Sequence, residues 1–310
     1  MLATNSTVVA ISNQVQAATG ISLPVVDPND PTEKALHQLM LDDDAAMDEI
    51  TGWIHENQAY AKNGAGETKQ ELNKRIHARL DVVRKEYQDF LQKNTNSARG
   101  HLAFGTFLND IGEEDGGAVE YEKSKDIDPG NPAVWNNLAN YYGEFSPVTN
   151  AFAYYAKAIE LNPAEPVYYQ NFATTVYLFR RDATNFYNIN ESQVFDKALG
   201  LYRQAMQLAP NDLPLATDYA QSYYEIKPWR TNDILLAWTN ALNIAQDENE
   251  REGIYVHLAR WNITFGRWTA AQAHLEAITN AAFADMRKRL EHNLAEKQHE
   301  AAATNAPAKS

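Results

Sequence analysis

The fold of this chain is most clearly indicated by residues 132–165, PAVWNNLANYYGEFSPVTNAFAYYAKAIELNPAE. The second half of the stretch contains Ala151, Tyr155 and Ala158, and their i, i+4, i+7 spacing places them on one face of a helix. The first half carries the small residue Ala139 among bulky neighbours. Because two helix axes approach closely only where side chains are small, the stretch predicts a pair of packed antiparallel helices.

The same pattern recurs along the chain with a spacing of 34 residues. Pro129 and Pro163 end two of the helical stretches and are 34 residues apart, and Pro210 follows after 47, which is 34 plus an insert of 13. Small first-helix residues recur in register at Gly105, Ala139, Ala173, Ala220 and Ala259, and the second-helix triplet recurs at Gly117-Tyr121-Ser124 and Ala198-Tyr202-Ala205. A 34-residue period of paired helices resembles the tetratricopeptide repeat family.

The resemblance implies an all-α, right-handed solenoid of helix–turn–helix repeats. About five units are expected over 98–280, at 98–131, 132–165, 166–212 with the insert, 213–251 and 252–280. The flanks are expected to be an extended or flexible segment at 1–30, a helical extension or degenerate repeat at 31–97, a capping helix at 281–299 and a flexible tail at 300–310. The last two repeats match less well, since the small–aromatic–small triplet is replaced by Ile234, Trp238 and Ala241 in the fourth and by Ala271, Leu275 and Ile278 in the fifth.

Composition narrows the classes of partner. The chain has 27 Lys and Arg against 41 Asp and Glu, a formal charge of −14, which disfavours nucleic acid and anionic membranes. It has no cysteine, hence no disulfide or thiolate metal site, and no run of 18 apolar residues that would span a bilayer. Residues 1–33 lack the basic start and apolar core of a signal peptide, so a cytoplasmic protein and an exported one whose signal peptide is missing both fit.

No motif in the sequence predicts a catalytic residue, a metal or a cofactor. The eight histidines form no metal-ligand spacing, and neither a nucleotide-binding glycine motif nor a G-x-S-x-G nucleophile motif occurs. Asp42, Asp43 and Asp44 lack the glycine and closing glutamate of a calcium loop. We therefore interpret these three as acids favoured by the dipole at a helix start.

The resemblance also implies where a ligand would bind. First helices of successive units line a concave surface, through the residues three before, two before and one after the small residue. These positions hold Asn136, Asn137, Asn140, Gln170, Asn171, Thr174, Thr217, Asp218, Gln221, Val256, His257 and Arg260. A side-chain amide has both a donor and an acceptor, so this set predicts a groove that captures the backbone of an extended peptide. An ordinary solvated helix face is the alternative.

One known binding mode of the family is excluded by charge. Repeats that clamp the terminal carboxylate of chaperones use two asparagines, matched here by Asn140 and Asn171, together with basic residues. The basic positions hold Asn136, Pro214 and Asp218 in this chain. A carboxylate there would meet no positive charge and one negative charge.

The 13-residue insert, at roughly 180–194, is expected between the two helices of the third unit. It carries Arg180 and Arg181 close to Phe186 and Tyr187, residue types typical of a contact loop in an otherwise acidic protein. The same residues are equally able to pack the insert onto its repeat, so both interpretations stay open.

The sequence therefore predicts a non-catalytic scaffold that binds an extended peptide or partner segment in an amide-rich groove. Two alternatives from other classes are a self-assembling structural array and an enzyme that uses the N-terminal helical extension. No cofactor, nucleic acid or membrane span is expected, and no oligomeric state is specified.

Overall fold

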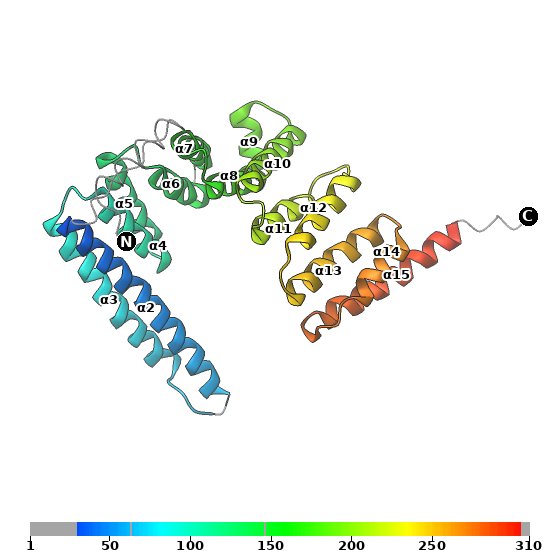
Figure 1. Cartoon of the computed structure of the whole chain (residues 1–310), viewed down its shortest axis with the longest axis horizontal. Helices are drawn as coiled ribbons and strands as arrows, with labels where there is room; N and C mark the ends of the chain where they lie inside the picture. Colours follow the sequence, from blue (N-terminus) through cyan, green and yellow to red (C-terminus); the bar gives the residue numbers. More distant parts are fainter. Residues whose placement is uncertain (1–29, 63, 146, 305–310) are drawn as a thin grey trace, which may run out of the picture. The chain divides into compact units, whose positions relative to one another are not determined.

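The computed structural model describes residues 30–62, 64–145 and 147–304. Every regular element in these ranges is a helix, as predicted, and short turns join successive helices (Figure 1). The predicted extended segment up to residue 29 and the tail from residue 305 lie outside the described residues. The chain divides into two compact units, here called unit 1 and unit 2, which are described separately.

Unit 1, residues 1–163, contains two long helices followed by two helix pairs. Asp30 and Pro31 start the first helix: the Asp30 carboxylate accepts a 2.8 Å hydrogen bond from the backbone N–H of Thr32, and Pro31 is the first helical residue. The two long helices lie side by side (blue and cyan in Figure 1). The helices are α2 (Pro31–Ala61), α3 (Lys69–Lys93), α4 (Ala98–Asp110), α5 (Glu114–Ile127), α6 (Pro132–Phe145) and α7 (Val148–Leu161).

The helical extension shares a hydrophobic core with the first helix pair. The ring of Tyr87 on α3 stacks on Phe104 of α4 with centroids 5.3 Å apart, and Phe107 lies 5.6 Å from the same ring. Leu36 and Leu39 of α2 are buried in this cluster. Helices α2 and α3 are therefore packed on the repeats, although their sequence lacks a clean copy of the repeat.

Small residues lie at the helix contacts where the repeat pattern places them. A Cβ atom on Gly105 of α4 would lie 2.7 Å from the ring of Tyr121, and one on Gly117 would lie 2.9 Å from the carbonyl oxygen of Gly105. Ala139 and Ala151 occupy the equivalent positions of α6 and α7, and both are fully buried. The contacts α4–α5 and α6–α7 are thus as close as the small side chains allow.

Unit 2, residues 164–310, contains three helix pairs, an inserted helix and a final long helix. The pairs are α8 with α10, α11 with α12, and α13 with α14, while α15 packs on α13 and α14. The elements are α8 (Pro166–Leu178), α9 (Arg180–Tyr187), α10 (Glu191–Leu208), α11 (Leu213–Ser222), α12 (Thr231–Ile244), α13 (Glu248–Thr264), α14 (Trp268–Glu276), the short 3-10 helix η1 (Ala281–Phe283) and α15 (Ala284–Thr304).

The insert is not a loop over its whole length. Residues 180–187 form the helix α9, and the last residues of the expected insert, 191–194, already belong to α10. A capping box explains the early start of α10, since Asn190 and Gln193 each accept a 3.0 Å hydrogen bond from the other's backbone N–H. Asn190 and Gln193 are visible in the sequence, but the boundary predicted from the 34-residue period placed the start of this helix later.

Two further expectations are corrected by the helix bounds. Asp42, Asp43 and Asp44 lie in the middle of α2, which starts at Pro31, so the dipole at a helix start does not account for them. The final helix begins after η1 and continues to Thr304, beyond the capping helix expected to end at residue 299.

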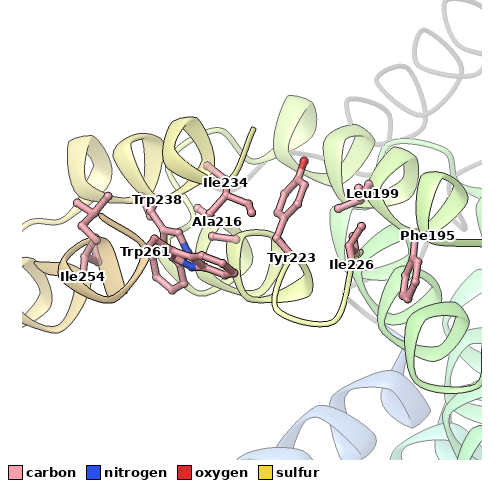
Figure 2. Packing of buried hydrophobic residues seen from close by; sticks show 13 residues of the cluster. Phe195, Leu199, Ala216, Tyr223, Ile226, Ile234, Trp238, Ile254 and Trp261 are labelled. Carbon is pink, nitrogen blue, oxygen red and sulfur yellow. The ribbon is translucent and has the colours of Figure 1, made fainter. Parts of the chain in front are cut away.

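Tryptophans fill the core of unit 2 where the repeat pattern is degenerate. Trp238 of α12 and Trp261 of α13 lie close together in a cluster with Ile234 and Ile254 (Figure 2). Trp238 is fully buried, and neither indole N–H has a hydrogen-bond partner within the described residues. The two rings therefore contribute here as large apolar groups.

Within residues 30–304, leaving out 63 and 146, no helix has the length and apolar character needed to cross a bilayer.

Candidate functional site

The first helices of unit 2 border two adjoining pockets. A polar pocket of about 360 Å³ lies among α8, α10 and α11, and an apolar pocket of about 420 Å³ lies among α11, α13 and α15. Gln221 lines both, so we treat them together as the unit 2 groove. The lining of the polar pocket includes Thr174, Tyr202, Asp218 and Gln221, and that of the apolar pocket includes Leu213, Gln221, Trp238, Asn249, Ile254, His257, Phe283 and Met286.

Hydrogen bonds within the polar pocket fix three of the predicted groove residues. The Gln170 amide donates to the Asp218 carboxylate at 2.9 Å, which links α8 to α11. The Thr174 hydroxyl lies 2.8 Å from the hydroxyl of Tyr202, and it also reaches the carbonyl oxygen of Gln170 at 3.0 Å. These polar groups are positioned by one another, so they hold the shape of the pocket. Gln221, by contrast, is exposed.

The apolar pocket is built on the buried core of unit 2. Leu213 comes from α11, Trp238 from α12 and Ile254 from α13. Phe283 and Met286, from η1 and α15, close the other side. The final helix therefore supplies a wall of the pocket and does not only cap the repeats.

His257 lines the apolar pocket, where its ring packs against two aromatic side chains. Its ring stacks on Trp238 with centroids 4.0 Å apart and planes 7° from parallel, and its Nδ1 lies 2.8 Å from the hydroxyl of Tyr224. Burial, together with the positive charge of Arg260, lowers the pKa of His257 to about 4. At neutral pH this imidazole is uncharged and contributes a flat apolar surface with one polar edge.

Arg260 and Asn171 do not line the unit 2 groove. Arg260 is exposed on α13, where its guanidinium carbon lies 5.8 Å from the centre of the Tyr224 ring. Asn171 is half-buried on α8, and its carbonyl oxygen accepts a 2.9 Å hydrogen bond from Thr175. The predicted set thus separates into residues inside the pockets and residues beside them.

In unit 1 the three predicted asparagines of α6 have different surroundings. Asn136 is buried, with 6% of its surface exposed, and its amide donates to the side chain of Asn137 at 3.3 Å. Asn140 is exposed, and its side-chain oxygen accepts a 2.7 Å hydrogen bond from Tyr155. Burial removes Asn136 from the set of solvated amides that the sequence suggested. Asn137 lines a pocket of its own unit.

This unit 1 pocket has a volume of about 430 Å³. It is lined by residues from the helices α2, α3, α4 and α6 and from the turn that follows α5. Its apolar wall includes Met40, Met47 and Leu102, and its polar lining includes Asp43, Asp44, Tyr87, Arg99, Asp110, Asp128, Asn131 and Asn137. The α2 residues come from the helical extension, for which no binding role was predicted. No group of three side chains suited to a metal ion was found in the described part of the chain.

Burial shifts the titration of two carboxyl groups that line the unit 1 pocket. It raises the pKa of Asp43 to about 6, although the Tyr87 hydroxyl donates to this carboxylate at 3.0 Å and so acts in the opposite direction. Burial also raises the pKa of Asp110. Carboxylates with raised pKa values gain from a positive charge placed beside them.

The four residues singled out in the insert split into two pairs. Arg180 forms a 3.1 Å ion pair with Glu191, and the Tyr187 ring lies 4.2 Å from the ammonium of Lys197, so both pack back onto α10. Arg181 and Phe186 are exposed. Packing onto the repeat therefore accounts for Arg180 and Tyr187, and a contact role for Arg181 and Phe186 stays a prediction.

Comparison with solved structures identifies the fold. PilW, described as a widely conserved type IV pilus biogenesis factor, has a TM-score of 0.53 with 11% identity, over 72% of this chain and 96% of that one. The C-terminal part of a TPR repeat-containing protein from Cytophaga hutchinsonii has a TM-score of 0.52 with 15% identity, over 82% and 98%. YrrB, described as a TPR protein with an unusual peptide-binding site, has a TM-score of 0.50 with 12% identity, over 68% and 97%.

The chain thus has the fold of tetratricopeptide-repeat proteins, which confirms the fold class predicted from the 34-residue period. No family model and no curated protein sequence matches it. At identities of 11 to 15% the likeness concerns the fold, and the chemistry of the pockets has to be derived from this chain's own residues.

Proposed function

We propose that the chain is a non-catalytic interaction protein whose unit 2 groove binds an extended segment of a protein partner. The observation that carries this proposal is the junction of the polar and apolar pockets at Gln221. An extended segment alternates side chains with backbone polar groups and rises about 3.3 Å per residue, so it can use both pockets at once. YrrB, with the same fold, is described as having a peptide-binding site.

The apolar pocket supports an apolar anchor residue in the partner. Its walls include Leu213, Ile254 and Met286, and the flexible methionine side chain adapts to anchors of different shape. Complete burial of a leucine or phenylalanine side chain contributes roughly 1.5–3 kcal/mol. The pocket volume of about 420 Å³ is ample for such a side chain.

Exposed amides support capture of the partner's backbone next to that anchor. Gln221 at the junction and Asn249 in the apolar pocket are both exposed, and each can donate to a C=O group and accept from an N–H group. A hydrogen bond of this kind contributes about 0.5–1.5 kcal/mol net. Because these contacts are made to the backbone, they select for an extended conformation of the partner and not for a particular sequence.

The surroundings of His257 support a role without catalysis. Its Nδ1 bonds to Tyr224, whose own pKa is raised by burial, and its ring is held flat against Trp238. With a pKa of about 4 the imidazole is neutral at neutral pH, and its Nδ1 is already engaged in the hydrogen bond with Tyr224. This arrangement serves packing rather than proton transfer near pH 7.

Selection of peptides against the purified chain tests the proposal. Peptides selected from a random library would be measured by fluorescence polarisation with wild type and with Gln221→Trp, which places a large side chain at the junction. Gln204→Trp, the same change at an exposed position of α10 outside both pockets, is the matched control. We expect affinity to fall at least about tenfold for Gln221→Trp alone, as for the loss of roughly 1.4 kcal/mol.

Equal affinity of the selected peptides for Gln221→Trp and wild type would contradict binding in this groove. Light scattering of the free protein separates the proposal from a self-assembling array, whose mass would grow with concentration. A constant mass together with the Gln221-specific loss supports the proposed function.

A further inference from the structure

The unit 1 pocket combines an apolar wall with carboxylates from separate elements. Asp43 and Asp44 project from α2, Asp110 ends α4, and Asp128 follows α5. These groups share a cavity of about 430 Å³ with Met40, Met47 and Leu102. Apolar contacts and negative charge in one enclosed space call for a ligand that has both an apolar part and a cationic part.

The positive charges near the pocket are already paired. Arg99 of α4 lines the pocket and forms an ion pair with Glu33. The positive charge of Arg79 on α3 acts to lower the pKa of Asp43, but the Arg79 guanidinium forms an ion pair with Glu49 at 3.0 Å. The Tyr87 hydroxyl supplies one hydrogen bond to Asp43. The pocket therefore keeps an excess of negative charge in a chain whose net charge is −14.

We propose that the unit 1 pocket binds a basic side chain, arginine or lysine, of a protein partner. Both side chains carry a charged head on an apolar stem, which matches carboxylates set beside methionines. The head would lie between Asp110 and Asp43, and the stem would lie against Met40 and Met47. The first 29 residues of the chain contain no Lys or Arg, so they offer no basic side chain to this pocket.

The polar groups around Asp43 add a pH dependence to this binding. The groups that face it are Tyr87 and Arg79 from α3, Asp44 from α2 and Asp110 from α4. Since burial raises the pKa of Asp43 to about 6, part of this carboxyl is protonated below pH 6. Binding of a cation should therefore weaken as the pH falls from 7 to 5.

Methionine methyl groups provide a direct test with the full chain. The protein has five methionines, of which Met40 and Met47 line the unit 1 pocket, Met286 lines the unit 2 groove and Met206 lines neither. The chain labelled with 13C at the methionine methyls would be titrated with an acetylated, amidated Gly-Ser-Arg-Ser-Gly peptide. The same peptide with citrulline, which keeps the shape and lacks the charge, is the control probe.

We expect the arginine peptide to shift the Met40 and Met47 signals in a saturable way that raised salt weakens, and the citrulline peptide to leave them in place. Asp110→Asn should weaken binding about tenfold, as expected for one charge-assisted hydrogen bond. Asp126→Asn, the same change at an exposed position of α5 outside the pocket, should leave binding unchanged.

Three results would overturn the inference. These are unmoved Met40 and Met47 signals, equal shifts with the citrulline peptide, and equal losses for Asp110→Asn and Asp126→Asn. A response of Met286 alone would also overturn it while leaving the proposed unit 2 groove in place, so the two proposals fail separately.

Discussion

The unit 1 pocket and the apolar pocket of unit 2 are both bordered by first helices of repeats, yet they differ in charge. Carboxylates from α2 and α4 face the unit 1 pocket, whereas Trp238, Ile254 and a neutral His257 line the apolar pocket of unit 2. In each case a helix outside the repeat pairs supplies part of the wall. That helix is α2 in unit 1 and α15 in unit 2.

The repeats therefore form a common frame, and the helices added to it, α2 and α15, supply several of the side chains that distinguish the two pockets. Met40 and Asp43 come from α2, and Met286 comes from α15. We expect buried side chains to fix the added helices on the repeats, and we expect the charges of Asp43 and His257 to respond to pH.

Removal of the buried leucines that hold the added helices should cause the largest change in the free energy of unfolding. Leu36 of α2 is 1% exposed and Leu294 of α15 is 3% exposed, and each packs in the core of its unit. Replacement of either by alanine should lower the free energy of unfolding by roughly 2–5 kcal/mol. Thermal and urea unfolding measure the change. Exposed Leu41→Ala and Leu236→Ala are the matched controls, with changes expected within about 0.5 kcal/mol.

Overpacking of the frame should have the next largest effect, and it should be similar in the two units. Ala139 and Ala173 are fully buried at first-helix contacts of unit 1 and unit 2. Leucine at either position should cost roughly 1–3 kcal/mol, because the facing helix cannot approach as closely. Ala153→Leu and Ala273→Leu, on exposed faces, control for the added side chain. Unchanged unfolding midpoints for both buried variants would refute the repeat register.

The two pockets should respond to pH in opposite directions. Burial raises the pKa of Asp43 to about 6 from an ordinary value of 3.8, so its contribution to stability falls as the pH rises from 4 to 6. Burial lowers the pKa of His257 to about 4 from 6.5, so its contribution falls as the pH drops from 6.5 to 4.

Two variants isolate these contributions. Relative to wild type, Asp43→Asn should gain in melting temperature towards pH 7, and His257→Phe, which keeps a flat ring beside Trp238, should gain towards pH 4. Melting curves from pH 4 to pH 8 measure both differences. Parallel curves for a variant and wild type would show that its group does not titrate differently in the folded state.

The exposed part of the insert should have the smallest effect. Phe186 is 45% exposed on α9, so Phe186→Ala should change the free energy of unfolding by no more than about 0.5 kcal/mol. Val194 of α10 is fully buried and serves as the contrast, since Val194→Ala creates a cavity. Similar losses for the two variants, measured by urea unfolding, would show that α9 is part of the core.

The fold was predictable because its signal is repeated. Small residues such as Gly105, Ala139 and Ala173 recur in register, and each reports the same close helix contact. The start of α10 was locally readable in Asn190 and Gln193, but the repeat period outweighed that signal. Boundaries of single helices depend on such local caps, which a period does not specify.

The pockets were only partly predictable. Gln221, His257 and Asn137 were found by repeat position, and all three line a pocket. Asp43 was interpreted as part of a helix start because the run Asp42–Asp44 gave no sign of what packs against it. The pocket it lines is formed with α4 and α6, and contacts between elements distant in sequence leave no short-range pattern.

The most direct test of two chemically different pockets is one methionine-methyl spectrum recorded with two peptides. Gly-Ser-Arg-Ser-Gly and Gly-Ser-Leu-Ser-Gly, both acetylated and amidated, differ only in the central side chain. We expect the arginine peptide to shift Met40 and Met47, the leucine peptide to shift Met286, and Met206 to stay in place with both. Shifts of the same methyl groups by both peptides, or by neither, would contradict this expectation.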